Sequence, residues 1–339
     1  MPRASLWVLG AVALVLAATF SLAIGAVGTG PGEVARALLE ALGLAPSGTS
    51  LPEHVSVVAN IRAPRIVTAI AVGASLGAAG ATMQGVFRNP LADPSLLGVS
   101  LGAALGAACV LVLVERVAST WWTPGGAFVG GVIATSLAMI SARRRGTLDT
   151  AALLLGGIAV QAFCGAMIGL LTYIATDAKQ RDLTFWLLGS LGGATWGRLA
   201  ASAAPLVASI AFLPWLGGSL DALSLGQAEA SDLGVDVRRT RLFAVLLAAL
   251  GVGAAVAVTG PIGFVGLVVP HLCRYLGAVS YRSLIPASAL GGAILLVIAD
   301  TAARTIAKPA ELPIGVVTAF IGAPFFYILL MRRPSAESS

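Results

Sequence analysis

The stretch Arg62–Gly106 decides how the chain is built; it reads RAPRIVTAIAVGASLGAAGATMQGVFRNPLADPSLLGVSLGAALG. It contains an apolar run, Ile66–Gln84, then a turn rich in Asn, Asp and Pro, and then the start of a second apolar run, Leu96–Val114. A helix needs about 20 apolar residues to cross a bilayer. Asn-Pro and Asp-Pro steps favour turns. The stretch therefore predicts two membrane-spanning helices joined by a short turn.

The same pattern continues along the chain. Ten segments meet or approach the length of a spanning helix: Leu6–Val27, Ile66–Gln84, Leu96–Val114, Trp121–Ser141, Ala151–Ile174, Leu199–Leu216, Leu242–Val258, Ile262–Leu276, Leu284–Ala303 and Ile314–Met331. The eighth is short and contains Pro270, so its ends stay open. The gaps between segments are too short for a soluble domain. We therefore expect an all-α polytopic membrane protein with ten transmembrane helices, forming one transmembrane domain over residues 1–339.

Composition supports a protein that lives in a bilayer. Of 339 residues, 58% are hydrophobic and 11% are charged, against about 25% charged in soluble domains. Glycine occurs 41 times, and small residues let helix backbones approach closely in membranes. The spacing small-xxx-small recurs and predicts a tightly packed bundle: Gly73-x3-Gly77, Gly102-x3-Gly106, Gly126-x3-Gly130 and Gly165-x3-Gly169.

The N-terminus and the cysteines each allow a simple interpretation. Arg3 precedes the apolar run Leu6–Val27, which is longer than the 7–15 residues of a signal-peptide core. We interpret this run as the first spanning helix, with a signal peptide as the alternative. Cys109, Cys164 and Cys273 lie inside apolar runs without paired spacing, as expected of small buried hydrophobic residues.

Arginines predict the orientation, because cytoplasmic loops carry an excess of Lys and Arg. With both termini in the cytoplasm, the triplet Arg143–Arg145 and the pair Arg332–Arg333 lie inside. The same topology leaves Arg62, Arg65 and Arg304 outside, against the rule. The net charge of +6 is spread between apolar runs and not along one basic stripe, so we expect no nucleic-acid partner.

A weak internal repeat is a further possibility. Arg62-Ala-Pro-Arg65 opens an apolar helix that reaches Gln84, and Arg238-Arg-Thr-Arg241 opens another that reaches Gly260. The two helices run in opposite directions in this topology, which is typical of an inverted repeat. Chance similarity between Ala- and Gly-rich helices explains the pattern equally well.

Three sequence blocks resemble the FecCD family of ABC-transporter permeases. The first contains Arg88-Asn-Pro-Leu-Ala-Asp-Pro94 followed by Leu97-Gly-Val-Ser100; the others are GPIGFVGLVVPHLCRYLG at Gly260–Gly277 and ELPIGVVTAFIGAPFF at Glu311–Phe326. The family imports iron-siderophores, haem and vitamin B12, and the chain looks most similar to bacterial haem permeases. The resemblance covers nearly all of the chain after residue 60.

The resemblance implies a fold and a set of partners. The expected fold is BtuC-like, that of vitamin B12 permeases of type II ABC importers, in the bacterial inner membrane. Its expected partners are a second copy of this permease, two cytoplasmic ABC ATPase subunits and a periplasmic substrate-binding protein. The chain contains neither a phosphate-binding loop nor a metal-ligand motif. We therefore expect no catalytic residues, cofactor or metal in this chain, with ATP and Mg on the ATPase.

A polar segment at residues 217–241, between the sixth and seventh apolar segments, is the candidate contact with the ATPase. Gly226 and Gly234 flank a short helical stretch, and each could stop or redirect the chain. In the family, the equivalent segment forms short helices that seat in a cleft of the ATPase. The residues expected to do so here are Leu225, Gly226, Glu229, Ala230, Leu233 and Gly234. A solvated loop is the alternative.

Arg62, Arg65 and Arg304 are the candidate docking residues for the binding protein. Family permeases carry arginines at these places that pair with glutamates of the docked protein, and guanidinium holds carboxylate bidentately. Contact with lipid phosphates or snorkelling is the alternative. Arg304 also has a local alternative, because Asp300 lies one helical turn earlier.

The loop before the fifth apolar segment is the candidate gate, because in similar permeases this region closes the pathway at its cytoplasmic end. Its residues are Leu148, Asp149 and Thr150. On the following helix, Gln161, Thr172 and Tyr173 are polar groups that lipid would penalise, so they could face an aqueous pathway. Hydrogen bonds between helices explain them equally well.

We expect an importer permease that moves haem, or another iron chelate, from periplasm to cytoplasm by alternating access. Phe185 and Trp186 in RDLTFWLLGSLGGATW (Arg181–Trp196) would suit a planar macrocycle, although interfacial aromatics are common. A ferric-siderophore or vitamin B12 permease is the alternative within the family. An ion-coupled secondary transporter is the alternative of another class, but Asp300 is the one acidic residue well inside an apolar segment. His271 is expected to be structural and His54 solvated.

Overall fold

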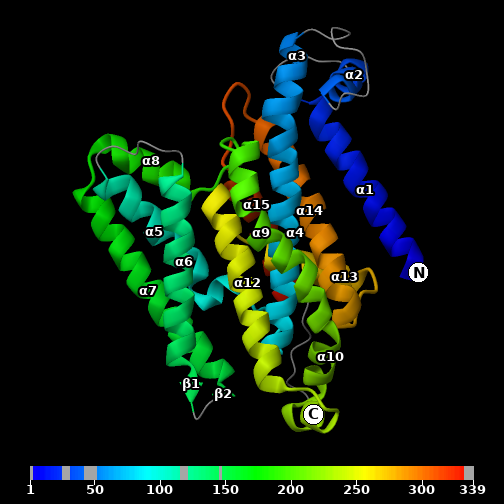
Figure 1. Ribbon diagram of the computed structural model, residues 1–339, viewed down its shortest axis with the longest axis vertical. Helices are drawn as coiled ribbons and strands as arrows, with labels where there is room; N and C mark the ends of the chain where they lie inside the picture. The colour runs from blue at the N-terminus through cyan, green and yellow to red at the C-terminus, as the bar shows by residue number, and fades with distance from the viewer. Residues whose placement is uncertain (1–2, 25–30, 42–51, 115–120, 145–146, 332–339) are drawn as a thin grey trace.

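The structure is a computed structural model that describes residues 3–24, 31–41, 52–114, 121–144 and 147–331. It is a helical bundle with one short hairpin (Figure 1). In chain order the elements are α1 (Arg3–Ala23), α2 (Pro31–Ala41), α3 (Pro52–Val57), π-helix η1 (Val58–Arg62), α4 (Ala63–Val86), 3₁₀-helix η2 (Pro94–Leu97), α5 (Val99–Leu113), α6 (Trp122–Ser141), β1 (Arg143–Arg144), β2 (Thr147–Leu148), α7 (Thr150–Ile174), α8 (Asp177–Leu187), α9 (Trp196–Phe212), 3₁₀-helix η3 (Leu213–Leu216), α10 (Gly217–Leu225), α11 (Gln227–Asp232), α12 (Val237–Thr259), α13 (Val265–Tyr275), α14 (Tyr281–Thr305) and α15 (Ile314–Met331).

Each of the ten predicted apolar segments contains a helix, but the helices differ in length. In the described part of the chain, six helical stretches are long and apolar enough to cross a membrane: 54–86, 122–141, 150–174, 196–225, 237–259 and 281–305. Three shorter helices are also apolar, at 7–23, 99–113 and 314–329. The prediction of an all-α polytopic membrane protein is confirmed, and six of the predicted spans reach full length.

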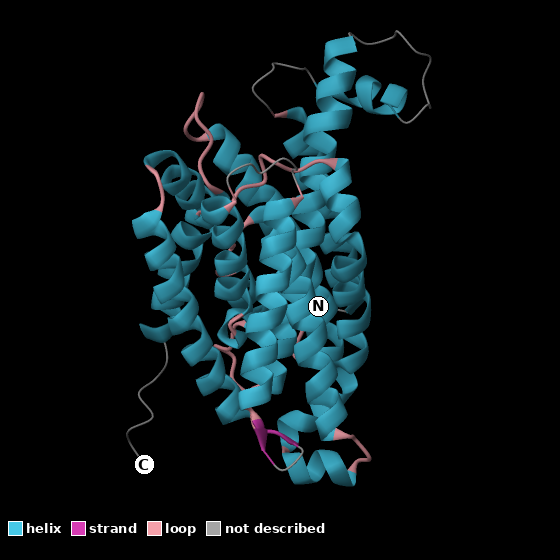
Figure 2. Cartoon of the chain, turned by 60° about the vertical axis from the view of Figure 1, so that its left-hand side comes forward, coloured by secondary structure: helices cyan, strands magenta, loops and turns pink. Residues whose placement is uncertain are grey.

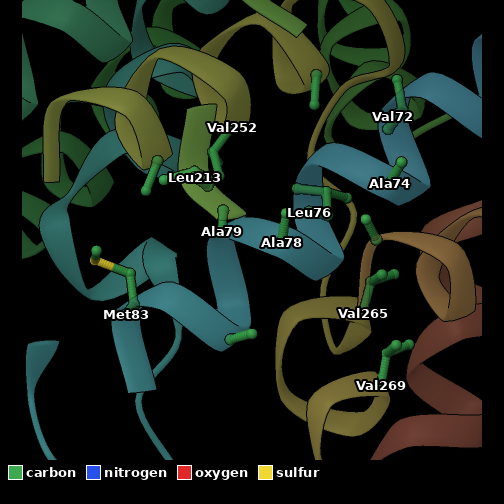
Figure 3. Packing of buried hydrophobic residues seen from close by; sticks show 14 of the residues in the cluster. Val72, Ala74, Leu76, Ala78, Ala79, Met83, Leu213, Val252, Val265 and Val269 are labelled. Carbon is green, nitrogen blue, oxygen red and sulfur yellow. The ribbon is translucent and has the colours of Figure 1, made fainter. Parts of the chain in front are cut away.

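The centre of the bundle is the contact between α4 and α14. Gly73 faces the backbone of Gly292, and Gly77 faces the carbonyl oxygen of Ser288, so closely that a Cβ on either α4 glycine would overlap it. The small-xxx-small spacing therefore brings two helix backbones together, as predicted. Figure 3 shows the small side chains of α4, including Val72 and Ala78, packed among residues of neighbouring helices.

A second pair of helices uses the same device. Gly102 and Gly106 of α5 meet Gly130 and Gly126 of α6, with backbone against backbone in both directions. The fourth glycine pair behaves differently. A Cβ added at Gly165 or Gly169 of α7 would meet nothing within 4 Å. This pair therefore packs against no part of the chain that the structure describes.

Two helices are preceded by non-helical backbone. The eighth predicted segment, Ile262–Leu276, becomes helical at Val265, so α13 has 11 residues and a length of about 16 Å. That is too short for a hydrocarbon core of about 30 Å.

The sixth predicted segment, Leu199–Leu216, is shorter than the helix observed there. The helix continues beyond Leu216, through η3 into α10, and ends at Leu225. α5, with 15 residues, follows the turn of η2.

The two ends of the bundle carry different elements. One end, here called the hairpin end, carries β1, β2, α10 and α11; the other, here called the α8 end, carries α8 and α3 (Figures 1 and 2). α4 runs towards the hairpin end and its neighbour α12 runs away from it. These antiparallel neighbours are the two helices of the proposed inverted repeat, which stays an interpretation.

Candidate functional site

The predicted ATPase contact forms a compact helical corner at the hairpin end (Figure 2). α10 ends at Gly226, whose φ of +151° lies in a region that favours glycine. α11 then ends at Gly234, with φ +80°. The N–H of Val235 donates to the carbonyl of Ala230 (3.0 Å) and the N–H of Gly234 to that of Ser231 (2.9 Å). This pair of bonds is a Schellman motif, so both glycines end helices as predicted.

The corner is fixed to the bundle by Asp221 of α10. Its carboxylate accepts hydrogen bonds from the backbone N–H of Tyr281 (2.6 Å) and of Arg282 (3.4 Å) at the start of α14. The carboxylate thereby satisfies N–H groups that a helix start leaves unpaired. Since α14 packs along α4 through the centre of the bundle, Asp221 connects α10 to the central helix pair.

The six predicted contact residues divide into two groups. Leu225 and Leu233 are large apolar side chains with 66% and 64% of their surface exposed. Glu229 and Gly234 are also exposed, whereas Gly226 and Ala230 are buried. The exposed leucines project from a rigid corner, while the buried residues shape it. Large exposed apolar side chains at a polar corner are consistent with a partner surface.

The predicted gate residues lie in and beside the hairpin. β1 pairs with β2, matching Arg143 with Leu148 and Arg144 with Thr147. The carboxylate of Asp149 accepts from the N–H groups of Ala151 (2.9 Å) and Ala152 (3.3 Å), so Asp149 is the N-cap of α7. Thr150 is the first residue of that helix, and the side chain of Leu148 lies outside the described ones.

The three polar residues predicted for the pathway do not share one environment. Tyr173 is 87% exposed and lies at the centre of the exposed face of α7. Gln161 and Thr172 are half-buried on the flank of that face. The hydroxyl of Thr172 donates to the carbonyl of Ile168 (2.8 Å), which satisfies it within its own helix.

A cavity of about 460 Å³ is lined by two stretches that interrupt the α-helical pattern. One stretch, residues 260–264, enters α13; the other, the turn before α5, includes Asp93 and Pro94. A Cβ at Gly266, the second residue of α13, would lie 3.2 Å from Cδ of Pro94, so the start of α13 packs against this turn. Non-helical backbone within a membrane protein is tolerated where it is buried in protein or lines a cavity. Both stretches do so here, along with Phe326 of α15.

Asp93 is held in this turn by the backbone of Ser95. Its carboxylate accepts from the N–H of Ser95 (2.8 Å), and burial raises the pKa of Asp93, against the opposing effect of that hydrogen bond. The residue thus caps η2 at the edge of the cavity. Sequence reasoning assigned this turn a structural role only and missed its place on the cavity wall.

The predicted docking residue Arg65 lies inside an ion cluster at the α8 end. Its Nη2 lies 2.9 Å from Oδ1 of Asp300, and its Nη1 lies 2.9 Å from Oε2 of Glu311. The Asp300 side chain is 1% exposed and that of Glu311 is 50% exposed. The guanidinium therefore bridges a buried carboxylate to one at the surface.

Arg304 and Arg62 tie α1 to this cluster. Nε of Arg304 lies 3.1 Å from Oδ2 of Asp300, which confirms the local pair that the sequence suggested. Its Nη2 donates to the hydroxyl of Ser21 (2.6 Å), and Nη1 of Arg62 donates to the carbonyl of Leu22 (2.7 Å). All three arginines are thus engaged within the chain, and their docking role stays a prediction.

The histidines and cysteines take no part in these sites. His271 packs edge-on against Tyr275 and Phe325, with ring centroids 4.9 and 5.9 Å away. Nδ1 of His54 lies 3.7 Å from Oε2 of Glu33. The three cysteines are free thiols, and Cys164 and Cys273 are buried. Among the described residues, no group of three or more His, Cys, Asp or Glu side chains could hold a metal ion.

Comparison with known proteins gives a consistent result. The profile of the FecCD transport family matches residues 13–332. The hemin transport system permease protein HmuU of Yersinia pestis is 46% identical over 82% of this chain and 84% of its own. The cobalamin import system permease protein BtuC of Halobacterium salinarum is 42% identical over 85% of this chain and 77% of its own. A solved structure described as an inward-facing metal-chelate type ABC transporter superposes with a TM-score of 0.82 and 32% identity, covering 95% of this chain and 97% of that one.

Proposed function

Because the chain belongs to the FecCD transport family and is a multi-pass membrane permease of the ABC-importer kind, we propose that it moves haem, or another iron chelate, from periplasm to cytoplasm. The observation that supports haem as the substrate is the 46% identity with the hemin permease of Yersinia pestis. The cobalamin permeases follow at 42% and 41%, so vitamin B12 is the second candidate and a ferric siderophore the third.

The corner formed by α10 and α11 is the proposed seat for the ATPase. A segment that transmits an ATP-driven movement must be rigid, joined to the bundle and exposed to its partner. Gly226 and the Schellman motif at Gly234 give the corner a defined shape, Asp221 joins it to α14, and Leu225 and Leu233 face outwards. ATP and Mg would bind to the ATPase chain. The hairpin end would then be cytoplasmic, in the bacterial inner membrane.

The α8 end is the proposed docking face for a periplasmic binding protein. Its ion cluster reaches the surface at Glu311, which holds Nη1 of Arg65. A carboxylate on the binding protein would take the place of Glu311 on the same guanidinium, since both are bidentate partners of equal charge. In this proposal Asp300 keeps its ion pairs with Arg65 and Arg304 within the bundle. Docking replaces only Glu311, the surface partner of Arg65, by a carboxylate of the binding protein.

The transport unit is proposed to be a homodimer. α7 presents Gly165 and Gly169 with nothing within 4 Å, although the other three glycine pairs pack closely. A second copy would supply the missing helix contact. The cavity at residues 93–96 and 260–264 would open towards the shared pathway, and alternating closure of its two ends would move the substrate.

An ion-coupled secondary transporter has less support. Such a transporter needs an acidic residue within the membrane that can bind and release its coupling ion. Asp300 is held by both Arg65 and Arg304, at 2.9 and 3.1 Å. Two fixed cations leave this carboxylate no capacity for a third.

Uptake by proteoliposomes tests the substrate. The vesicles would contain this permease with its ATPase and binding protein, and ATP-dependent uptake of haem, a ferric siderophore and vitamin B12 would be compared. The proposal expects haem to accumulate fastest. Uptake of vitamin B12 with no uptake of haem would assign the chain to the cobalamin importers.

A further inference from the structure

Arg198 lies at the α8 end like Arg65 and Arg304, but unlike those two it has no acidic partner among the described residues. It lies in the first turn of α9, where its Nη1 donates to the carbonyl of Gly193 (2.9 Å). Among the described residues, no carboxylate pairs with it. Its Nε is buried without a hydrogen-bond partner. Burying a charge without a partner costs free energy, so a bound anion would stabilise this partly buried cation.

Two adjoining cavities meet at this guanidinium. The first, about 240 Å³, is lined in part by Thr123, Ser190 and Trp186. The hydroxyl of Ser190 accepts from the N–H of Gly192 (3.0 Å), so its own proton is available to an acceptor. This cavity is therefore polar and offers donors beside a positive charge.

The second cavity, about 430 Å³, is apolar. Its lining includes Phe128 of α6, Pro205 of α9 and Ala254 of α12. Both cavities share Pro124, Arg198, Ala257 and Val258. Together they form one space with a polar arm, an apolar arm and a cation between them. That is the pattern of a ligand with an anionic head and a hydrocarbon tail.

The depth of this space in the membrane identifies the ligand further. Trp121, Trp122 and Trp196 lie at the starts of α6 and α9 and are all exposed. Exposed tryptophans gather at the level of lipid headgroups. The polar arm therefore lies at headgroup level, and the apolar arm lies between helices that face the hydrocarbon.

We propose that the space around Arg198 binds an anionic phospholipid, with its phosphate on the guanidinium and one acyl chain in the apolar cavity. A phosphate oxygen completes the donor set of Arg198 and accepts from the hydroxyl of Ser190. The acyl chain covers Phe128 and Pro205. The site is distinct from the cavity lined by residues 93–96 and 261–264. Its polar arm adjoins the outer edge of the ion cluster, because a Cβ at Gly192 would lie 3.3 Å from Oγ of Ser190 and 3.6 Å from Oε2 of Glu311.

Native mass spectrometry of the purified full-length permease tests this proposal. Phosphatidylglycerol and phosphatidylcholine with the same acyl chains are added, and the bound fraction of each is measured. We expect phosphatidylglycerol to bind more tightly, and Arg198→Gln to weaken its binding about tenfold through loss of a charge-assisted hydrogen bond. Arg181→Gln, which removes an exposed arginine of α8 at the same end, is the matched control and should leave binding unchanged.

A second variant tests the apolar arm. Ala201 lines the apolar cavity and is exposed, so Ala201→Phe fills that cavity while Arg198 remains. Weaker phosphatidylglycerol binding, with an unchanged melting temperature, supports a lipid. Equal binding of phosphatidylglycerol to the wild type and Arg198→Gln would overturn the proposal. So would a normal affinity in Ala201→Phe together with displacement by equimolar inorganic phosphate, which indicates a bare anion site.

Discussion

Arg65 of α4 and Asp300 of α14 form an ion pair inside the bundle, with 2.9 Å between Nη2 of the arginine and Oδ1 of the aspartate. Nε of the same arginine also donates to this carboxylate, at 3.0 Å. The pair connects the two central helices, and Arg304 and Glu311 extend it to α1 and to the surface. A charge removed from such a cluster leaves its partner buried and uncompensated.

Asp300→Asn should therefore destabilise the chain strongly. Arg65 and Arg304 would lose the carboxylate between them, and breaking a buried pair costs about 3–5 kcal/mol. The measurement is the free energy of unfolding in detergent. Arg239→Ala is the matched control, because its pair with Asp236 is 79% and 53% exposed and should contribute about 1 kcal/mol or less. Equal effects of the two substitutions would refute the structural role of Asp300.

Glu311→Gln should strengthen association with the binding protein. The substitution removes the negative charge that competes for Nη1 of Arg65, while Asp300 still holds the rest of that guanidinium. We expect a several-fold gain in affinity by surface plasmon resonance, mostly through a faster association rate. Unchanged affinity would mean that Arg65 keeps its partner on docking. Reversal of Arg62 and Arg65 to Glu should abolish association with the binding protein. Because both side chains are buried, the free energy of unfolding of this double variant must be measured alongside its binding.

Leu225→Asp and Leu233→Asp should prevent assembly with the ATPase and leave the permease folded. Both side chains are exposed at the corner of α10 and α11, so a charge there is solvated in the free permease and desolvated in the complex. Co-purification with the ATPase measures assembly. Phe185→Asp is the control, an equally exposed apolar residue on α8 at the opposite end. Normal assembly of both leucine variants would place the ATPase elsewhere.

Gly169→Leu should weaken dimerisation without weakening the fold of one copy. No atom of the described chain lies within 4 Å of a Cβ at this position, so the larger side chain fits the isolated subunit and obstructs a close helix contact. Crosslinking or mass photometry reports the fraction of dimer. Gly125→Leu on α6, where a Cβ also meets nothing within 4 Å, is the control. A fully dimeric Gly169→Leu variant would exclude this face from the interface.

Much of the fold could be predicted, because the bilayer imposes a length on apolar segments. Each predicted segment contains a helix, and three glycine pairs mark close helix contacts. The ends of α13 could not be predicted from hydropathy. Residues 260–264 are as apolar as a helix, but Gly260 and Phe264 have φ of +71° and +68°, which ends α12 and delays the start of α13. A Cβ at Gly260 would overlap the carbonyl oxygen of Trp186, a tertiary constraint that hydropathy does not show.

The candidate sites were predictable where their geometry is local. The pair of Arg304 with Asp300 follows from i,i+4 spacing, and the corner at Gly226 and Gly234 follows from glycine positions. The partners of Arg65 lie 235 and 246 residues away, and no spacing rule brings them together. Charges that oppose the expected topology were the available signal. Glu311 carries no such signal, because an acidic residue on the outer side does not oppose the expected topology. Arg198 does carry it, since it is a cation at the same end with no acidic partner among the described residues.

In the proposed mechanism, this permease moves its substrate only when a separate ATPase acts through α10 and α11. The most direct test is the initial rate of haem uptake into proteoliposomes that contain the permease and its binding protein, with and without the ATPase. We expect uptake to require both the ATPase and ATP and to be lost in Leu225→Asp. Uptake at the same rate without the ATPase, driven by a proton or sodium gradient, would contradict it.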